Sequence, residues 1–153
     1  MSTIYTIGFA GKSAREFFTL LMDNGVRRLV DVRLSNNSQL AAFTKKRDLE
    51  YFLEAICKIP YLHVPLLAPT KEILDGYKKA RITWAQYEER YGKLLVERRK
   101  EILRTLSPDL LDGTCLLCSE KEAAQCHRRL AAEFLLRAFE ESAPGRFDGI
   151  RHL

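Results

Sequence analysis

The chain has 153 residues, a hydrophobic fraction of 46% and a formal net charge of +5. Its length fits one domain, and its composition is too hydrophobic for a disordered chain. No apolar stretch approaches the ~20 residues of a membrane-spanning helix, and the first residues are strand-like rather than typical of a secretory signal. We therefore expect a cytoplasmic protein with no membrane partner, whose four cysteines are reduced thiols.

The first half of the chain predicts three strands that alternate with helices. The strands are expected at residues 3–7, 28–32 and 60–64. One helix should begin at the capping box Ser13–Glu16 and end near Asn24, because Ser and Glu satisfy free amides at a helix start. A second helix should cover residues 48–56, and residues 33–44 are expected to form a polar loop.

The second half continues the alternation. Residues 66–82 look irregular, with a short helix near 72–79, and a capping box at Thr83–Gln86 opens a long helix that reaches Leu106. We then expect a buried strand at residues 114–118, a helix that begins near Cys126 and an edge strand at residues 149–153. This order predicts a single α/β domain over residues 1–153. It would have three layers, a mainly parallel sheet with helices on both faces.

Ionisable and nucleophilic side chains gather where the predicted strands end. In open α/β sheets, ligands bind beyond the carboxyl ends of the strands. The residues expected there are Thr6, Gly8, Asp31, Arg33, His63, Cys118, Glu120, Cys126, His127 and Arg128. The opposite edge carries ordinary turn residues such as Asn24-Gly25. This asymmetry predicts a functional site at the carboxyl edge, with these side chains in one shared hollow.

The residue types at this edge indicate an anion site with acid/base chemistry. A helix that begins near Cys126 would favour anions and lower thiol pKa values at its positive end. Arg33 and Arg128 could clamp a phosphate or carboxylate. The catalytic candidates are Glu120, Asp31, Cys118 and His127. The candidates for binding the anion are Arg33, Arg128, Cys126, Thr6, Gly8 and His63.

Several of these residues have a purely structural alternative. Asp31 could simply form an ion pair with Arg33 or Arg128, and Cys118 could only fill space in the core. His63 could equally be a hydrogen-bonded core histidine. The group is more informative than any single member, because reactive side chains gather at only one edge of the predicted sheet.

The cysteine spacing only superficially resembles a zinc site. Side chains alternate along a strand, so Cys115 and Cys118 should point to opposite faces and cannot easily bind one ion. We therefore assign no metal ligands, and the residues identify no cofactor. Cys115 and Cys57 are expected to be small buried hydrophobic residues.

The same segments resemble the domain-of-unknown-function family numbered 488. The segments that carry the resemblance are Thr6-Ile7-Gly8, Val30-Asp31-Val32-Arg33, residues 61–66, Leu117-Cys118-Ser119-Glu120, Cys126-His127-Arg128 and residues 149–153. The chain departs from such proteins at residues 34–38, which contain no Pro, and at Leu67-Ala68-Pro69, where they commonly have Leu-Gly-Gly. The resemblance implies the fold and the site, and it implies no particular activity.

We expect a small enzyme or ligand-binding protein that acts on a phosphorylated or nucleotide-like anion. A nucleic-acid-binding or nucleic-acid-processing module is the alternative, and it would add the basic run Lys45-Lys46-Arg47 to the same pocket. A ligand-sensing or partner-binding domain without turnover is a third possibility. Low-molecular-weight phosphatases fit poorly, since nine residues separate Cys118 from Arg128 where that class has five.

Overall fold

A central parallel sheet confirms the predicted α/β class. The computed structural model describes residues 2–37 and 39–153, so Met1 and Ser38, which ends the segment without Pro, lie outside the described residues. The strands are β1 (Ser2–Gly8), β2 (Arg28–Asp31), β3 (Tyr61–His63), β4 (Thr114–Cys118) and β5 (Phe147–His152). Every strand pair is parallel, and the strand order is β3-β2-β4-β1-β5.

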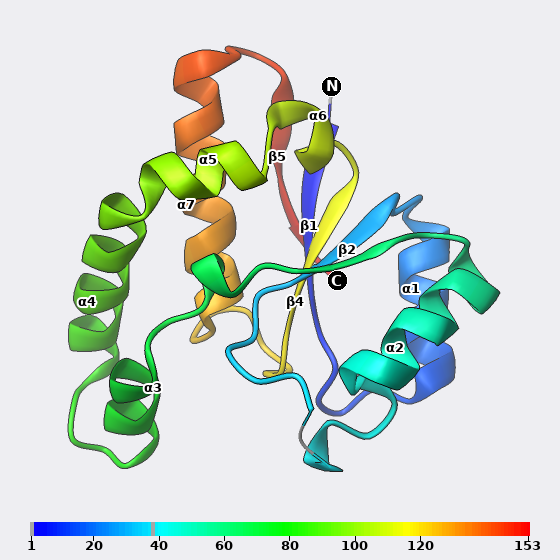
Figure 1. Cartoon of the computed structure of the whole chain (residues 1–153), viewed down its shortest axis with the longest axis horizontal. Coiled ribbons are helices and arrows are strands. Elements are labelled where there is room, and N and C mark those ends of the chain that lie inside the picture. Colours follow the sequence, from blue (N-terminus) through cyan, green and yellow to red (C-terminus); the bar gives the residue numbers. More distant parts are fainter. Residues whose placement is uncertain (1, 38) are drawn as a thin grey trace.

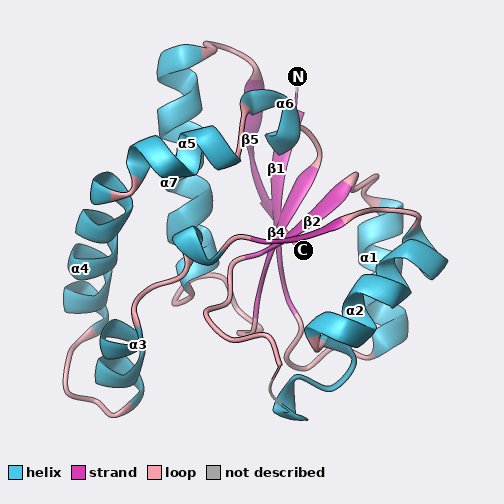
Figure 2. Cartoon of the chain, in the orientation of Figure 1, coloured by secondary structure: helices cyan, strands magenta, loops and turns pink. Residues whose placement is uncertain are grey.

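Helices cover both faces of this sheet, as predicted. They are α1 (Ala14–Asp23), α2 (Lys46–Phe52), α3 (Lys71–Lys78), α4 (Trp84–Glu97), α5 (Arg99–Thr105), α6 (Pro108–Leu111) and α7 (His127–Ser142). Figure 1 and Figure 2 show α1 and α2 on one side of the strands, and α3, α4, α5 and α7 on the other. No helix in the described ranges is long and apolar enough to cross a membrane.

Most predicted helix starts are present, and the differences lie mainly in where the helices divide and end. Thr83 and Gln86 form the complete capping box of α4. The predicted long helix is divided at Arg98, whose guanidinium donates hydrogen bonds to the carbonyls of Leu66 and Ala68. The predicted loop 33–44 ends in a 3-10 helix, Gln39–Thr44, and α6 is a single turn too short to show a helical periodicity in the sequence.

Strand alternation divides the core into two clusters, one on each face of the sheet. Leu29, Cys115 and Leu117 pack with α1 and α2, whereas Leu116 and Cys118 pack with α4, α5 and α7. This confirms that Cys115 and Cys118 point to opposite faces, because adjacent side chains of a strand alternate. The two faces are therefore separate chemical environments.

The chain leaves β1 and β4 in opposite directions. From β1 it passes through α1 over β4 to reach β2, and from β4 it passes through α7 over β1 to reach β5. These two strands are neighbours, and Gly8 at the end of β1 is in register with Cys118 at the end of β4. Such a reversal of strand order is the place where open α/β sheets bind ligands.

Candidate functional site

Two thiols and an imidazole meet at the carboxyl end of β4. Cys118 ends β4, Cys126 is the N-cap of α7, and His127 is the first residue of that helix. Their sulfur and ring nitrogen atoms all lie within 4.8 Å of one another, and all three residues are buried. We call these three residues the Cys118 cluster.

The imidazole of His127 is fixed by the backbone of β2. Its Nε2 lies 2.7 Å from the carbonyl oxygen of Val32. A carbonyl can only accept a hydrogen bond, so Nε2 carries the proton. Burial, the largest influence, lowers the pKa of His127, so the ring is neutral and its Nδ1 has a free lone pair. This Nδ1 lies 3.4 Å from the Sγ atom of Cys118.

The two thiols of the cluster differ in acidity. Burial opposes ionisation of Cys118, but hydrogen bonds from Cys126 and from the Ser119 amide, with the charge of Arg128, lower its pKa below the ordinary value. The hydrogen bond to Cys118, together with burial, raises the pKa of Cys126.

Arg128 fastens the loop that connects β4 to α7. Its side chain is 1% exposed, and its Nε donates to the Thr6 hydroxyl at 3.3 Å. Its Nη1 donates to the carbonyl of Glu120, and its Nη2 donates to the carbonyl of Lys121 at 3.2 Å. Among the described residues it forms no ion pair with a carboxylate.

Gly8 makes room for this loop at the end of β1. A Cβ atom at position 8 would lie 1.6 Å from the carbonyl oxygen of Glu120 and 2.7 Å from Nη1 of Arg128. The backbone of the loop also pairs with the segment after β1, through a hydrogen bond of 3.0 Å from the Ala10 amide to the Ser119 carbonyl. Only glycine fits at position 8, because the nearest obstructing atom is the backbone carbonyl oxygen of Glu120.

Two lysines lie close to the buried Arg128. Lys12 donates to the carbonyl of Gly8 at 2.9 Å, and burial and then the charge of Arg128 lower its pKa, while Glu122 and Glu16 act in the opposite direction. The aliphatic part of Lys121 packs beside Gly11. We call Lys12, Lys121 and Arg128 the cationic cluster.

Asp31 and Arg33 form a separate group on the opposite face, which packs with α1 and α2. Arg33 donates from Nε and Nη2 to the two carboxylate oxygens of Asp31, at 2.8 Å each. The Tyr61 hydroxyl donates to the same carboxylate at 2.6 Å, and Arg33 also bonds to Thr44. Asp31 is fully buried and forms an ion pair with Arg33, as expected if its role is structural.

The structure therefore brings only part of the predicted site together. Thr6, Gly8, Cys118, Cys126, His127 and Arg128 lie around the ends of β1 and β4, with the exposed Glu120 in the loop above them. Asp31 and Arg33 do not reach this side of the sheet, so the expected clamp of Arg33 with Arg128 is not formed. His63 is half-buried, and its Nε2 is hydrogen-bonded to the Arg33 carbonyl at 2.8 Å.

Three further residues lie at the site that were not among the predicted catalytic or binding residues. They are Lys12, Lys121 and His152, whose Nδ1 lies 2.6 Å from the Thr6 hydroxyl. Lys12 lies four residues after the first strand, so the sequence already indicates that it is near the carboxyl edge of the sheet. His152 reaches the site because β5 lies beside β1, with Thr6 and His152 in register.

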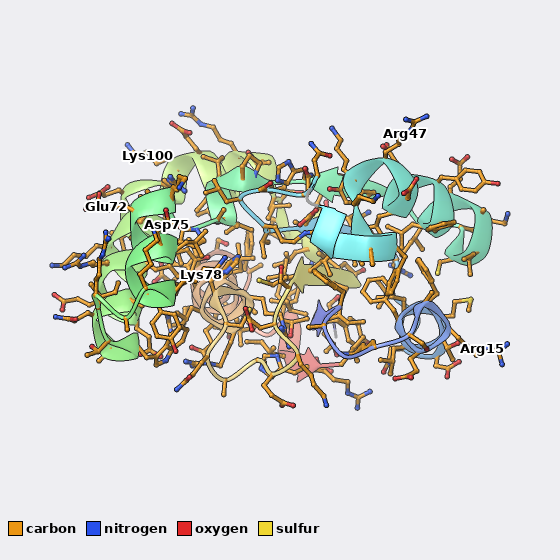
Figure 3. The ribbon with its side chains drawn as sticks, turned by 90° about the horizontal axis from the view of Figure 1, so that it is seen from below. Arg15, Arg47, Glu72, Asp75, Lys78 and Lys100 are labelled. Carbon is orange, nitrogen blue, oxygen red and sulfur yellow. The ribbon has the colours of Figure 1, made fainter. Side chains whose placement is uncertain are left out.

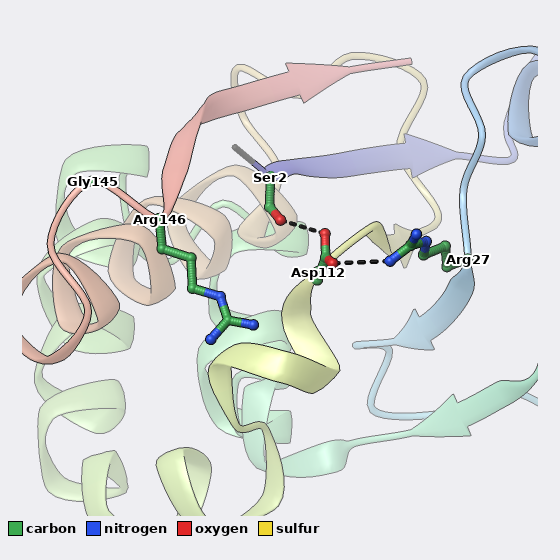
Figure 4. Close-up of a pocket in the computed structure, with 5 residues that line it drawn as sticks. All are labelled: Ser2, Arg27, Asp112, Gly145 and Arg146. Carbon is green, nitrogen blue, oxygen red and sulfur yellow. Dashed lines mark hydrogen bonds and ion pairs between the residues drawn. The ribbon is translucent and has the colours of Figure 1, made fainter.

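Two surface hollows lie elsewhere. One, of about 480 Å³, is at the amino ends of the strands and is lined by Ser2, Arg27, Asp112, Gly145 and Arg146 (Figure 4). Its Asp112 already pairs with Arg27 at 2.9 Å. The other, of about 350 Å³, is apolar and includes Phe18 of α1 and Phe52 of α2. Neither is lined by a predicted site residue.

Replacing Gly8 by Ala should disrupt the site and destabilise the protein by several kcal/mol. The added methyl would overlap the Glu120 carbonyl, and overpacking against a fixed group costs about 1–3 kcal/mol or more. Gly92→Ala is the matched control, because nothing lies within 4 Å of its Cβ and α4 should gain about 0.5–1 kcal/mol. Urea unfolding of both variants measures these changes. Equal stability of the two variants would show that the loop is not packed against β1.

Asp31→Ala should destabilise the fold by about 3–5 kcal/mol, because it leaves the charge of Arg33 buried without a partner. The double variant Asp31→Ala/Arg33→Leu should recover much of this loss. Asp75→Ala, which breaks an exposed pair with Lys71, should change the stability far less. Thermal unfolding at one pH compares all three. A small loss in Asp31→Ala would argue against a structural role for the buried pair.

Comparison with known proteins places the chain in a family. A sequence model of the family described as Domain of unknown function DUF488 matches residues 13–135. No curated protein and no solved structure matches the chain. The matched range includes the ion pair of β2, the end of β4, the Cys118 cluster and Arg128. It covers well over half of the 153 residues, so this chain belongs to the DUF488 family.

Proposed function

We propose that this protein binds a phosphorylated or nucleotide-like anion beside the loop that follows β4, at the carboxyl edge of the sheet. We further propose that it is a small enzyme whose reacting groups belong to the Cys118 cluster. The anion would lie on the solvent side of this loop, close to Lys12 and Lys121 and above the buried Arg128. Support for this function comes from charge, from the neighbouring reactive groups and from the exposed carboxylate of Glu120.

The buried charge of Arg128 carries the proposal. A guanidinium stays protonated at physiological pH, and a buried charge without an opposite charge is costly. The hydrogen bonds of Arg128 to two carbonyls and a hydroxyl satisfy three of its five N–H donors but supply no negative charge. Arg33, by contrast, is neutralised by Asp31. An anionic ligand would offset the charge that Arg128 adds to this edge.

Lys12 and Lys121 extend this positive charge towards solvent. Lys12 is half-buried beside Gly8, and Lys121 is exposed in the loop above it. The amino end of α7, at His127, adds the positive end of a helix dipole. A multiply charged group such as a phosphate is therefore favoured over a single carboxylate.

Glu120 is the better placed of the two carboxylates proposed as acid or base. Its side chain is exposed two residues after Cys118, in the loop that the cationic cluster holds. Asp31 is fully buried in its ion pair on the other face. We therefore propose Glu120 for proton transfer, with Cys118 and His127 as the reactive pair beneath it.

The nucleic-acid alternative has less support from the arrangement of charges. Lys46 and Arg47 are exposed on α2, whose side of the sheet is opposite to Arg128. Figure 3 shows Arg47 extending outward from that helix. The basic residues of α2 and the cationic cluster therefore do not form one continuous surface. We include an oligonucleotide among the ligands of the binding test below.

A thermal-shift titration tests the anion site. In buffer that contains a chelator, inorganic phosphate, a sugar phosphate, a nucleoside monophosphate and an oligonucleotide are compared. A true ligand at 100 times its Kd stabilises the protein by about 2.7 kcal/mol. Lys12→Ala should weaken binding at least tenfold, since a hydrogen bond to a charged group contributes about 1.5–3 kcal/mol.

Lys93→Ala is the matched control, because it removes the same charge from an exposed pair with Glu89 on α4. Arg128→Ala is compared with Arg98→Ala, which also removes an arginine bonded to carbonyls. The proposal fails if no anion binds, or if Lys12→Ala and Lys93→Ala have equal affinities. Tight oligonucleotide binding would favour the nucleic-acid alternative. In that case the logarithm of the affinity should fall by about 0.7–0.9 per phosphate contact for each tenfold rise in salt concentration.

A further inference from the structure

We propose that the Cys118 cluster binds one thiophilic divalent metal ion of the zinc type. The ligands would be the Sγ atoms of Cys118 and Cys126 and the Nδ1 atom of His127. This inference goes beyond the anion site and does not depend on it; with the ion bound, Cys118 and His127 act as its ligands and not as a free reactive pair. The proposed site also differs from the zinc site considered from the sequence, which would have needed Cys115 as a ligand. Cys115 lies on the other face of β4 and cannot take part.

The three ligand atoms lie close enough together for one ion to reach all of them. All lie within 4.8 Å of one another, and Sγ of Cys118 is 3.4 Å from Nδ1 of His127. In a tetrahedral site with Zn–S near 2.3 Å and Zn–N near 2.0 Å, two ligand atoms lie about 3.5–3.8 Å apart. Sγ of Cys118 is also 3.7 Å from Nε2, so it lies over the face of the ring, and a rotation of the Cys118 side chain would bring it to an ion on the Nδ1 lone pair.

His127 has the tautomer and the outer hydrogen bond that a metal ligand needs. Its Nε2–H donates to the Val32 carbonyl at 2.7 Å, so Nδ1 is the nitrogen with the free lone pair. Metal-bound histidines usually donate their other ring N–H to a carbonyl or carboxylate, which fixes the ring and increases its basicity. Here the partner is backbone of β2, which cannot rotate away.

The ligands are attached to rigid parts of the fold. Cys118 ends the central strand β4, and Cys126 and His127 begin the 16-residue helix α7. Arg128 ties the intervening loop through the carbonyls of Glu120 and Lys121. A site whose ligands are held by such elements loses little conformational freedom when the ion binds.

The charge balance of this buried site also permits a dication. On binding, the ion forms bonds to both sulfur atoms and to Nδ1, and any thiol proton still present leaves to solvent. Two thiolates then neutralise the ion, so no uncompensated charge is added beside Arg128. Two cysteines and one histidine form a three-ligand set, the pattern in which zinc keeps a fourth position for water or substrate.

Cobalt substitution of the wild-type protein tests this site. Protein freed of metal by a chelator under reducing conditions is titrated with Co²⁺ and then with Zn²⁺. We expect one ion per chain, a near-ultraviolet charge-transfer band from two thiolates, and intense visible bands typical of tetrahedral cobalt. Zn²⁺ should displace the cobalt and remove these bands. A ¹¹³Cd NMR shift on the same wild-type protein gives the number of sulfur ligands without any substitution.

Variants then identify the ligands. Cys118→Ser and Cys126→Ser should each halve the charge-transfer band, and His127→Gln should weaken binding at least tenfold while the band remains. Cys115→Ser and Cys57→Ser are the controls, since Cys115 is equally buried but faces α1 and α2. Both controls should bind cobalt as the wild type does. Circular dichroism verifies that each variant is folded.

Two results would overturn the proposal. One is wild-type protein that binds no stoichiometric metal, or binds it with no thiolate signal in either the cobalt or the cadmium spectrum. The cluster would then be held by S–H···N hydrogen bonds alone. The other is a set of folded Cys118 and Cys126 variants whose cobalt spectra match those of the Cys115 control.

Discussion

The guanidinium of Arg128 joins the parts of the chain that meet at the carboxyl edge. It connects α7, on which it sits, to Thr6 of β1 and to the carbonyls of Glu120 and Lys121 in the preceding loop. Cys118 and Cys126 lie at the two ends of that loop, so their separation depends on these bonds. The loop can approach β1 only because Gly8 has no side chain.

The two faces of the sheet differ in how their buried charges are balanced. On the face of α1 and α2, the charges of Asp31 and Arg33 cancel within one pair. On the face of α7, the charge of Arg128 adjoins two thiols and a neutral imidazole. The second face is therefore the one suited to an external anion. The proposed metal would keep it so, because two thiolates neutralise a dication and leave the positive charge of Arg128 in place.

Much of the fold follows from local patterns in the sequence. Alternating and near-continuous apolar runs located all the strands of the described sheet, since side-chain period is set by backbone geometry. Helix starts at Ser13 and Thr83 were predictable because a cap bonds to amides only a few residues away. The break at Arg98 was not, because the carbonyls that bind its side chain come from residues 66 and 68, in a distant segment.

The candidate site shows the same division between local and tertiary information. The sequence by itself placed Cys118, Cys126, His127 and Arg128 at one edge, because parallel strands share their carboxyl ends. Alternation also separated Cys115 from Cys118. Only the tertiary structure decided that Arg33 is taken by Asp31, that His127 bonds to the backbone of β2, and that His152 reaches Thr6. These contacts depend on the strand order β3-β2-β4-β1-β5, which is set by how the two faces pack and not by any local pattern.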